Sequence, residues 1–108
     1  VMTGTFGAWY PALALGVTAI ISALANCCPN PIAAVQELYD AGNMEGAREL
    51  YQRFFPVNAA VTGPYGIPGL KYATGRMGYT GGHVRNPLVD PSDADKAKLD
   101  QILYKALA

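Results

Sequence analysis

The side chains best suited to chemistry gather in the stretch from Ile67 to Leu88. Among its five glycines lie four basic or imidazole groups: Lys71, Arg76, His83 and Arg85. Such a stretch could cradle phosphate, and a desolvated Lys71 amine could form a Schiff base. The formal net charge is zero, however, so we favour cations that are solvated or paired with acids of neighbouring helices. His83 has no acidic partner within motif distance, which favours a surface or capping role.

Two further groups follow predicted strands. Gly4-Thr5-Phe6-Gly7 comes after the first apolar segment, and Ile21-Ser22 ends the second. Ligand sites of α/β proteins lie beyond the carboxyl ends of parallel strands, so both are candidate pocket residues. The first group lacks the third glycine of a dinucleotide-binding loop. A plain turn explains it equally well, and Ile21 and Ser22 could simply be packed.

The two cysteines, Cys27 and Cys28, are adjacent. A disulfide between neighbours would be strained, because the peptide bond holds their Cα atoms about 3.8 Å apart. We therefore expect buried thiols in a reducing compartment. The cysteine spacing of a zinc site is absent, and His83 is the single histidine. No metal site and no complete catalytic constellation are predicted in this chain.

The elements that would position these groups can be predicted from their patterns. Val1–Gly4 reads as a short buried strand, and residues 6–15 have apolar side chains at helical spacing. Gly16 ends that helix, and the β-branched run Val17–Ser22 is typical of a parallel strand covered on both faces. This order makes a βαβ unit, which needs neighbouring strands to cover its edges.

Amphipathic helices follow from Pro29 onward. Asn30-Pro31 predicts an N-cap and a first helical residue, and a second helix starts near Asn43. Pro56 lies inside the second helical pattern, where we expect a kink. A short helix from Pro68 to Met77 and a last helix beginning after Asp90-Pro91-Ser92 complete the chain. The predicted order is βαβ followed by four helices.

Length and charge exclude several classes. A chain of 108 residues holds one small domain, and zero net charge disfavours nucleic acid and anionic membrane surfaces. Ala12–Cys28 carries no charge and approaches the lower length limit of a spanning helix. Polar residues and glycine interrupt this run and no basic residue precedes it, so we expect neither a membrane span nor a secretory signal.

An ordered set of motifs runs along the chain: Gly4-Thr5, Leu15-Gly16, Ile21–Asn26, Asn58–Val61, Tyr65–Lys71, Gly78-Tyr79 and Val84–Leu88. The chain resembles the C-terminal third of the dihydrodipicolinate synthase and N-acetylneuraminate lyase family, and within it the 4-hydroxy-2-oxoglutarate aldolases. The family resemblance implies an α/β fold: the last part of a (β/α)8 TIM barrel, which needs about 250 residues, followed by a helical extension. Residues 1–28 would be strands seven and eight with their connecting helix, and residues 29–108 the final barrel helix and the extension.

The resemblance also implies a chemistry. Members of this family are class I aldolases, lyases or synthases, in which a strand-six lysine forms a Schiff base with pyruvate and a strand-five tyrosine relays protons. Both residues would precede Val1, so we expect no catalytic residue in this chain, no cofactor, and no activity from the chain alone. Lys71 and Arg85 match structural positions of the extension. The implied substrate-binding residues are Gly4, Thr5, Ile21 and Ser22.

The resemblance implies partners as well. They are a small 2-oxo acid such as pyruvate, the rest of the barrel, and further copies in a homotetramer, in the cytoplasm or the mitochondrial matrix. Sialate-cleaving members carry acidic side chains where this chain has Phe6 and Gly7, which favours a short 2-oxo acid. The alternative is a non-catalytic helical module for interaction or oligomerisation, derived from the same family.

Overall fold

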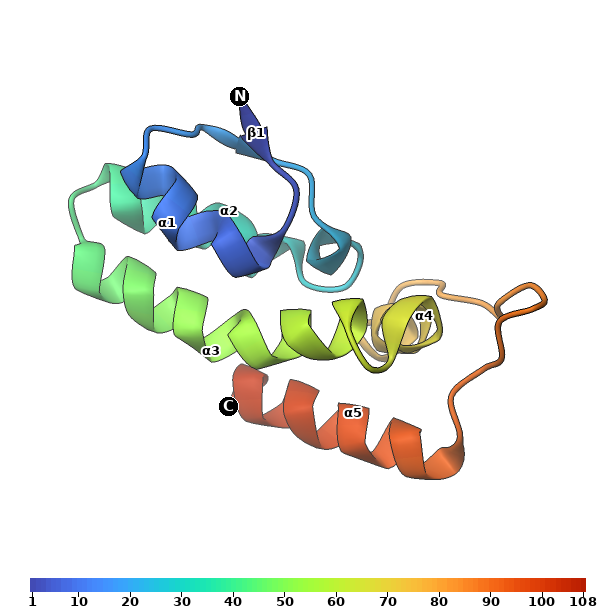
Figure 1. Ribbon diagram of the computed structural model, residues 1–108. Coiled ribbons are helices and arrows are strands. Elements are labelled where there is room, and N and C mark those ends of the chain that lie inside the picture. Colours follow the sequence, from blue (N-terminus) through green and yellow to red (C-terminus); the bar gives the residue numbers. More distant parts are fainter.

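The computed structural model describes residues 1–108 and begins with two short parallel strands (Figure 1). Thr3 pairs with Ile20 and Met2 with Ala19. The chain therefore runs strand, helix, strand, and the predicted βαβ order is confirmed. These first elements are β1 (Met2–Thr3), the 3₁₀ turn η1 (Phe6–Ala8), α1 (Trp9–Ala14) and β2 (Ala19–Ile20).

Four helices follow the second strand, as predicted. Two of them begin where the sequence predicted a helix start, near Asn43 and after Ser92, and in both a side chain caps the first turn. The Asn43 side-chain oxygen accepts a hydrogen bond from the Gly46 amide at 3.0 Å, and the Ser92 hydroxyl accepts one from the Asp95 amide at 3.2 Å. The remaining elements are the 3₁₀ turn η2 (Ala23–Asn26), α2 (Pro29–Asp40), α3 (Met44–Thr62), α4 (Gly66–Arg76) and α5 (Asp93–Leu107).

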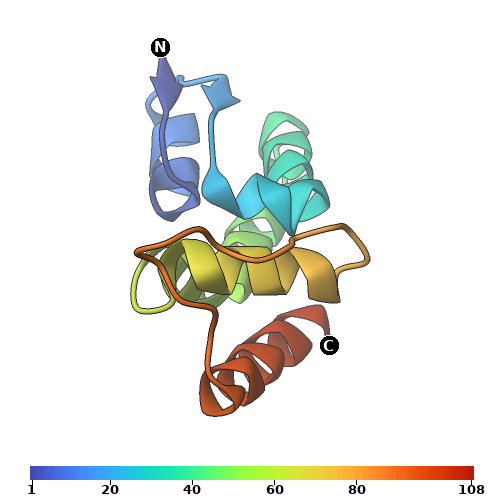
Figure 2. The same cartoon turned by 90° about the vertical axis from the view of Figure 1, so that its right-hand side faces the viewer.

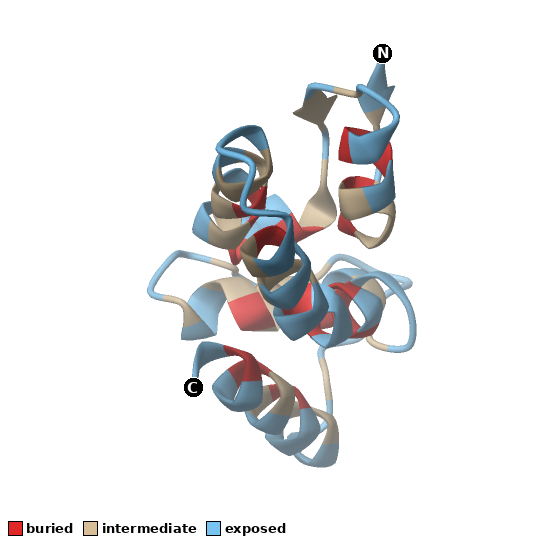
Figure 3. Cartoon of the chain, turned by 90° about the vertical axis from the view of Figure 1, so that its left-hand side faces the viewer, coloured by how far each residue is buried: buried red, intermediate tan, exposed pale blue.

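Helix α3 is the centre of the packing. In Figure 1, α1 and α2 lie along one side of it, α5 lies along the other, and α4 packs at its carboxyl end. Figure 3 shows the buried residues on the inner faces of these helices. Trp9 is fully buried, and its indole N–H donates to the Ile32 carbonyl at 3.0 Å, which ties α1 to α2. The core therefore lies between helices rather than on the sheet.

The strands differ from the prediction. Each pairs over two residues only, whereas we expected strands over Val1–Gly4 and Val17–Ser22. The expected burial of the first strand is also wrong, because 55% of Met2 is exposed. The sheet contains β1 and β2 alone, so no third strand covers their outer edges.

Helix boundaries required smaller corrections. α2 starts at Pro29 with Cys28 at the N-cap position, not at the predicted cap Asn30, because proline suits the first helical turn, where an amide N–H has no partner to lose. The predicted helix over residues 6–15 is divided into η1 and α1, and η2 was not predicted. α3 continues through Pro56, as expected, while the kink stays a prediction. None of the helices is long and apolar enough to span a membrane.

Candidate functional site at the carboxyl ends of the two strands

The carboxyl ends of β1 and β2 lie side by side. Thr3 pairs with Ile20, and the Ile21 amide donates to the Thr3 carbonyl at 3.0 Å. Neighbouring strands are about 4.8 Å apart, so continuing this register sets Gly4 opposite Ile21. Figure 2 shows the two chain segments leaving the sheet in the same direction. The structure thus brings all four sequence-predicted binding residues to one edge.

The four residues divide between two faces. Side chains alternate between the two faces along a strand. Gly4 and Ile21 therefore share one face, and Thr5 and Ser22 share the other. Ser22 indeed lines a pocket of about 340 Å³ between β2 and α2, together with Ile20. The face of Gly4 is open, because a Cβ atom there would meet no heavy atom within 4 Å, and 68% of Ile21 is exposed beside it. Gly4 and Ile21 can therefore touch a ligand directly.

Thr5 and Ser22 each begin a 3₁₀ turn. The Thr5 hydroxyl accepts a hydrogen bond from the Gly7 amide at 3.2 Å, which caps η1. The Ser22 hydroxyl accepts one from the Leu24 amide, also at 3.2 Å, which caps η2. These bonds satisfy amides that the short turns leave without carbonyl partners. Both hydroxyls therefore set the backbone direction just beyond the strand ends.

Tyr51 on α3 supports the first of these turns. Its hydroxyl donates to the Gly7 carbonyl, and its ring centroid lies 5.3 Å from that of Phe6. Burial raises the pKa of Tyr51 above its ordinary value, which keeps the hydroxyl protonated as a donor. Tyr51 is not among the site residues predicted from the sequence. Aromatic residues at helical spacing in α3 predict packing, but they do not predict the hydrogen bond from the Tyr51 hydroxyl to the Gly7 carbonyl.

Asn58 lies behind the same turn. It is buried, and its Oδ1 atom is the buried side-chain oxygen or nitrogen that has no hydrogen-bond partner. Its Nδ2 atom would lie 3.5 Å from a Cβ atom added to Gly7. Buried amides are normally fully bonded, so an unpaired one stands out. Asn58 was not predicted as a site residue from the sequence. The signal that could have revealed it is a polar residue among the apolar positions of α3.

The basic residues near α4 have mostly structural contacts. Arg76 pairs with Asp100 of α5 at 3.0 Å, which confirms pairing with a neighbouring helix for this cation. The Tyr72 hydroxyl donates to the same carboxylate at 3.0 Å. The Lys71 amino group donates to the His83 carbonyl at 3.2 Å, which agrees with a structural position. Arg85 is exposed and makes no ion pair, as expected of a solvated cation.

His83 does have an acidic partner, contrary to the sequence interpretation. Its Nδ1 atom lies 2.7 Å from Oδ2 of Asp90, and the Val84 amide donates to Oδ1 of Asp90 at 3.1 Å. The pair could not be predicted from the sequence, because His83 and Asp90 are seven residues apart in a loop that has no regular period. Asp90 therefore closes the loop that connects α4 to α5.

These bonds predict a pH effect on the loop. They lower the pKa of Asp90 below its ordinary 3.8, first through His83 and then through the Val84 amide. A lowered carboxyl pKa stabilises the closed loop above the ordinary value, and the stabilisation is lost as the pH falls through the lowered pKa. We expect pepsin to cleave residues 78–92 increasingly over that range. Asp90→Asn, which cannot ionise, should show no such step, and an identical step in both proteins would contradict the assignment.

Cys27 and Cys28 are free thiols and both are buried, as predicted. The neighbouring Cys28 and burial away from water raise the pKa of Cys27 above its ordinary value, so its thiol stays neutral and weakly nucleophilic. No three His, Cys, Asp or Glu residues come close enough to hold a metal ion.

Comparison with known proteins places this chain in a family. The model of the dihydrodipicolinate synthetase family matches residues 1–106. A 4-hydroxy-tetrahydrodipicolinate synthase of Chlorobaculum parvum is 39% identical over 102 residues, which cover 92% of this chain and 33% of that protein. An uncharacterized DapA-like lyase of Halobacterium salinarum is 37% identical over 91 residues, or 83% of this chain and 30% of the relative. The chain thus spans about a third of the length of these curated relatives.

Solved structures agree with the fold prediction. The KD(P)GA of T. tenax superposes with a TM-score of 0.88 at 21% identity, covering 99% of this chain and 38% of that one. Dihydrodipicolinate synthase from Thermotoga maritima gives a TM-score of 0.85 at 27% identity, covering 98% and 36%. The predicted fold class is confirmed: an α/β chain that forms the C-terminal part of a (β/α)8 barrel with a helical extension.

The family itself is one of enzymes, because the named relatives are synthases and lyases. Those two relatives come from a bacterium and an archaeon, so they give no support to a mitochondrial location. The family resemblance seen in Gly4-Thr5, Tyr65–Lys71 and Val84–Leu88 is confirmed by the match over nearly the whole sequence. The chain belongs to the dihydrodipicolinate synthetase family.

Proposed function

We propose that this chain supplies the last two strands and the helical extension of a class I aldolase, lyase or synthase that acts on pyruvate or another short 2-oxo acid. The observation that carries the proposal is the parallel register that sets Gly4 beside Ile21 at an open strand edge. Family membership supports it. Cleavage of 4-hydroxy-2-oxoglutarate and synthesis of 4-hydroxy-tetrahydrodipicolinate are the two activities in best agreement with the motifs and the named relatives.

In this proposal the covalent step uses a lysine outside the chain. Its amine attacks the C2 carbonyl of the 2-oxo acid, water leaves, and the resulting iminium accepts the electron pair of the C3–C4 bond when that bond breaks, which gives an enamine. In the synthetic direction the iminium first loses a C3 proton, and the enamine so formed donates its electron pair to the new carbon–carbon bond. Gly4 lets the substrate approach the backbone, since it has no side chain. Ile21 packs against the apolar part of the substrate and excludes water. Thr5 and Ser22 position these two residues by capping the turns.

We also propose that the two parts of the chain have different roles. Residues 1–28 complete the barrel wall, and residues 29–108 form its final helix and the extension, which takes part in a homotetramer. The exposed apolar residues Tyr104 and Leu107 of α5 support a role in assembly. Light scattering of the full-length protein tests the tetramer, and a monomer at micromolar concentration would contradict it.

Borohydride trapping tests the enzyme proposal. Full-length protein incubated with pyruvate and sodium borohydride should acquire one reduced adduct on a lysine upstream of Val1, detected by peptide mass spectrometry. An adduct on Lys71 would overturn the assignment of that lysine to structure. If no lysine is modified, the non-catalytic helical module becomes the better explanation.

Ile21→Ala tests the pocket wall. Loss of its apolar contact should lower kcat/KM for pyruvate about 10-fold or more, since each methylene in a substrate pocket contributes roughly 1–3 kcal/mol. Leu15→Ala is the matched control, because Leu15 is 85% exposed and precedes β2 at the opposite end of the strand. Equal losses in the two variants would exclude a specific contact of Ile21 with the substrate.

A further inference from the structure

Cys27 and Cys28 form a pair of thiols that the proposed reaction does not use. Both belong to the buried core, with 0% and 2% of their surfaces exposed. They occupy the joint between two elements, because Cys27 follows η2 as its last capping residue and Cys28 is the N-cap residue of α2. Two adjacent thiols can react with each other, which a single buried thiol cannot do.

Hydrogen bonds connect this joint to the end of β2. The Cys27 and Cys28 amides both donate to the Leu24 carbonyl, at 3.1 and 2.8 Å. The Leu24 amide in turn donates to the Ser22 hydroxyl at 3.2 Å. The Leu24 side chain is fully buried, so the backbone of η2 has little freedom to shift alone. A change in the geometry of the two cysteines therefore displaces the residues just after β2.

The two thiols differ in acidity. Cys27 has one S–H group, which it can donate to the Leu24 carbonyl at 3.5 Å or to the sulfur of Cys28. The bond between the two thiols raises the pKa of Cys27 and lowers the pKa of Cys28 below its ordinary 9.0. The amino end of α2 also favours a thiolate at Cys28. Cys28 is therefore the nucleophile of the pair, and Cys27 keeps its proton.

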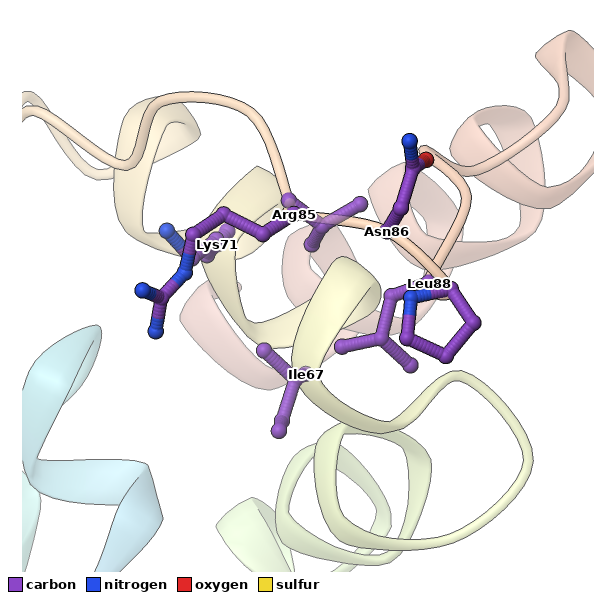
Figure 4. Close-up of a pocket in the computed structure, with 7 residues that line it drawn as sticks. Ile67, Lys71, Arg85, Asn86 and Leu88 are labelled. Carbon is purple, nitrogen blue, oxygen red and sulfur yellow. The ribbon is translucent and has the colours of Figure 1, made fainter.

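One short turn separates the pair from solvent. Ala25 and Asn26, the two residues before Cys27, are exposed, and Leu24 is the buried residue of η2. The pocket of about 340 Å³ between β2 and α2 reaches both sides of the joint, since Ala25 and Pro29 line it. By contrast, no cysteine lines the pocket of about 350 Å³ beside α4 that Figure 4 shows. Segments with few buried residues open locally at low free energy, so a small oxidant can reach the sulfurs through η2.

We propose that Cys27 and Cys28 are a reversible redox site, which a peroxide oxidises to a disulfide between the two neighbours. With hydrogen peroxide, the Cys28 thiolate forms a sulfur–oxygen bond, the oxygen–oxygen bond breaks, and the leaving hydroxide takes up a proton to become water. The Cys27 sulfur then attacks the sulfur of the Cys28 sulfenic acid, whose oxygen leaves as water with the Cys27 proton. The two thiols lose two electrons, and the peroxide gains them.

The disulfide should be easily reduced. The peptide bond holds neighbouring Cα atoms about 3.8 Å apart, whereas disulfides ordinarily need about 4.4 Å or more. Strained disulfides have more oxidising potentials, as expected of a labile, regulatory bond. Closing the ring also pulls the two amides away from the Leu24 carbonyl. Oxidation should therefore displace Ser22 and lower activity at the strand ends, a consequence that rests on the proposed function.

Peptide mass spectrometry of the full-length protein tests the redox site. Hydrogen peroxide should lower the mass of the peptide that contains both cysteines by two hydrogen atoms, and dithiothreitol should restore it. Dimedone present during the oxidation should label Cys28, because the sulfenic acid forms there. The proposal is overturned if the peptide keeps both thiols, or if sulfinic and sulfonic acids are its only oxidised forms. A dimedone label on Cys27 would overturn the assignment of the nucleophile.

Borohydride trapping of pyruvate on the same samples tests the effect on the strand ends. Oxidised wild type should form the adduct about 10-fold or more slowly than reduced protein, since a shift of about 1 Å in a site can cost about 100-fold. Dithiothreitol should restore the rate. An unchanged rate in the oxidised protein would refute the link to Ser22.

The control is the double variant Cys27→Ala, Cys28→Ala, which lacks both sulfurs and should keep its rate after peroxide. An equal loss in this variant would overturn the regulatory effect, because the oxidised group would then lie elsewhere. The peptide masses of wild type decide the redox site even if the double variant does not fold. If reduced wild type forms no pyruvate adduct, the proposed function fails, while the disulfide stands or falls on the peptide masses alone.

Discussion

Replacing Trp9 with alanine is expected to lower the free energy of unfolding by about 3–5 kcal/mol, as for other buried aromatic residues. Trp9 is the largest fully buried side chain and belongs to the single core cluster. Its removal would leave a cavity between α1 and α2 and an unpaired carbonyl at Ile32, because the indole N–H donates there. Urea denaturation of the full-length protein, followed by fluorescence or circular dichroism, measures the loss.

Two further substitutions separate the causes of this loss. Trp9→Phe keeps much of the volume but removes the N–H donor, so it should cost about 1–3 kcal/mol for the unpaired carbonyl of Ile32. Leu15→Ala removes a side chain that is 85% exposed and should change stability by about 0.5 kcal/mol or less. If Trp9→Phe cost as much as Trp9→Ala, the hydrogen bond rather than packing would be the main contribution.

Gly81→Ala should be the second most damaging change. An added Cβ atom would lie 1.9 Å from the carbonyl oxygen of Lys71 and 2.8 Å from its carbonyl carbon. Both are backbone atoms of α4, so no side-chain rotation relieves the clash, and the loop must move away from the helix. We expect a loss of about 1–3 kcal/mol, typical of overpacking, measured by the urea midpoint.

Gly75→Ala is the matched control and should have the opposite sign. Gly75 lies in α4, and a Cβ atom there would meet no heavy atom within 4 Å. Alanine in an exposed helix position should stabilise the protein by about 0.5–1 kcal/mol, because it reduces the conformational freedom of the unfolded chain. Equal destabilisation by both substitutions would show that the close approach at Gly81 has no special cost.

The sequence predicted most helices because their signals are local. Asn43 and Ser92 bond amides three residues away, so their caps can be recognised within one turn of helix. The apolar period of the last helix is also a local signal: Leu99 and Leu103 lie four residues apart, and both are buried. The parallel order of the first two strands followed from the βαβ pattern.

The features that escaped prediction depend on contacts between distant residues. The Tyr51 hydroxyl reaches Gly7 across 44 positions of sequence, and His83 meets Asp90 across a loop without a period. Strand length escaped for another reason. The apolar run at Val17–Ser22 indicates which side chains a strand there would bury. The number of residues that form strand pairs depends instead on which neighbouring strands are present, and here β2 has only β1 beside it. Candidate site residues could be named, but not the face to which each belongs.

The two hydroxyl-capped turns have one more consequence. Thr5 and Ser22 stand at the same point of two successive units, each built as strand, capped turn and helix, although the sequences of the units share no repeat. In a closed barrel such units are related by rotation about the barrel axis. This rotational symmetry is a property of the backbone fold and does not require the units to share the same residues. Substitutions at the ligand-facing positions of one unit can therefore diversify while its neighbour keeps the same scaffold.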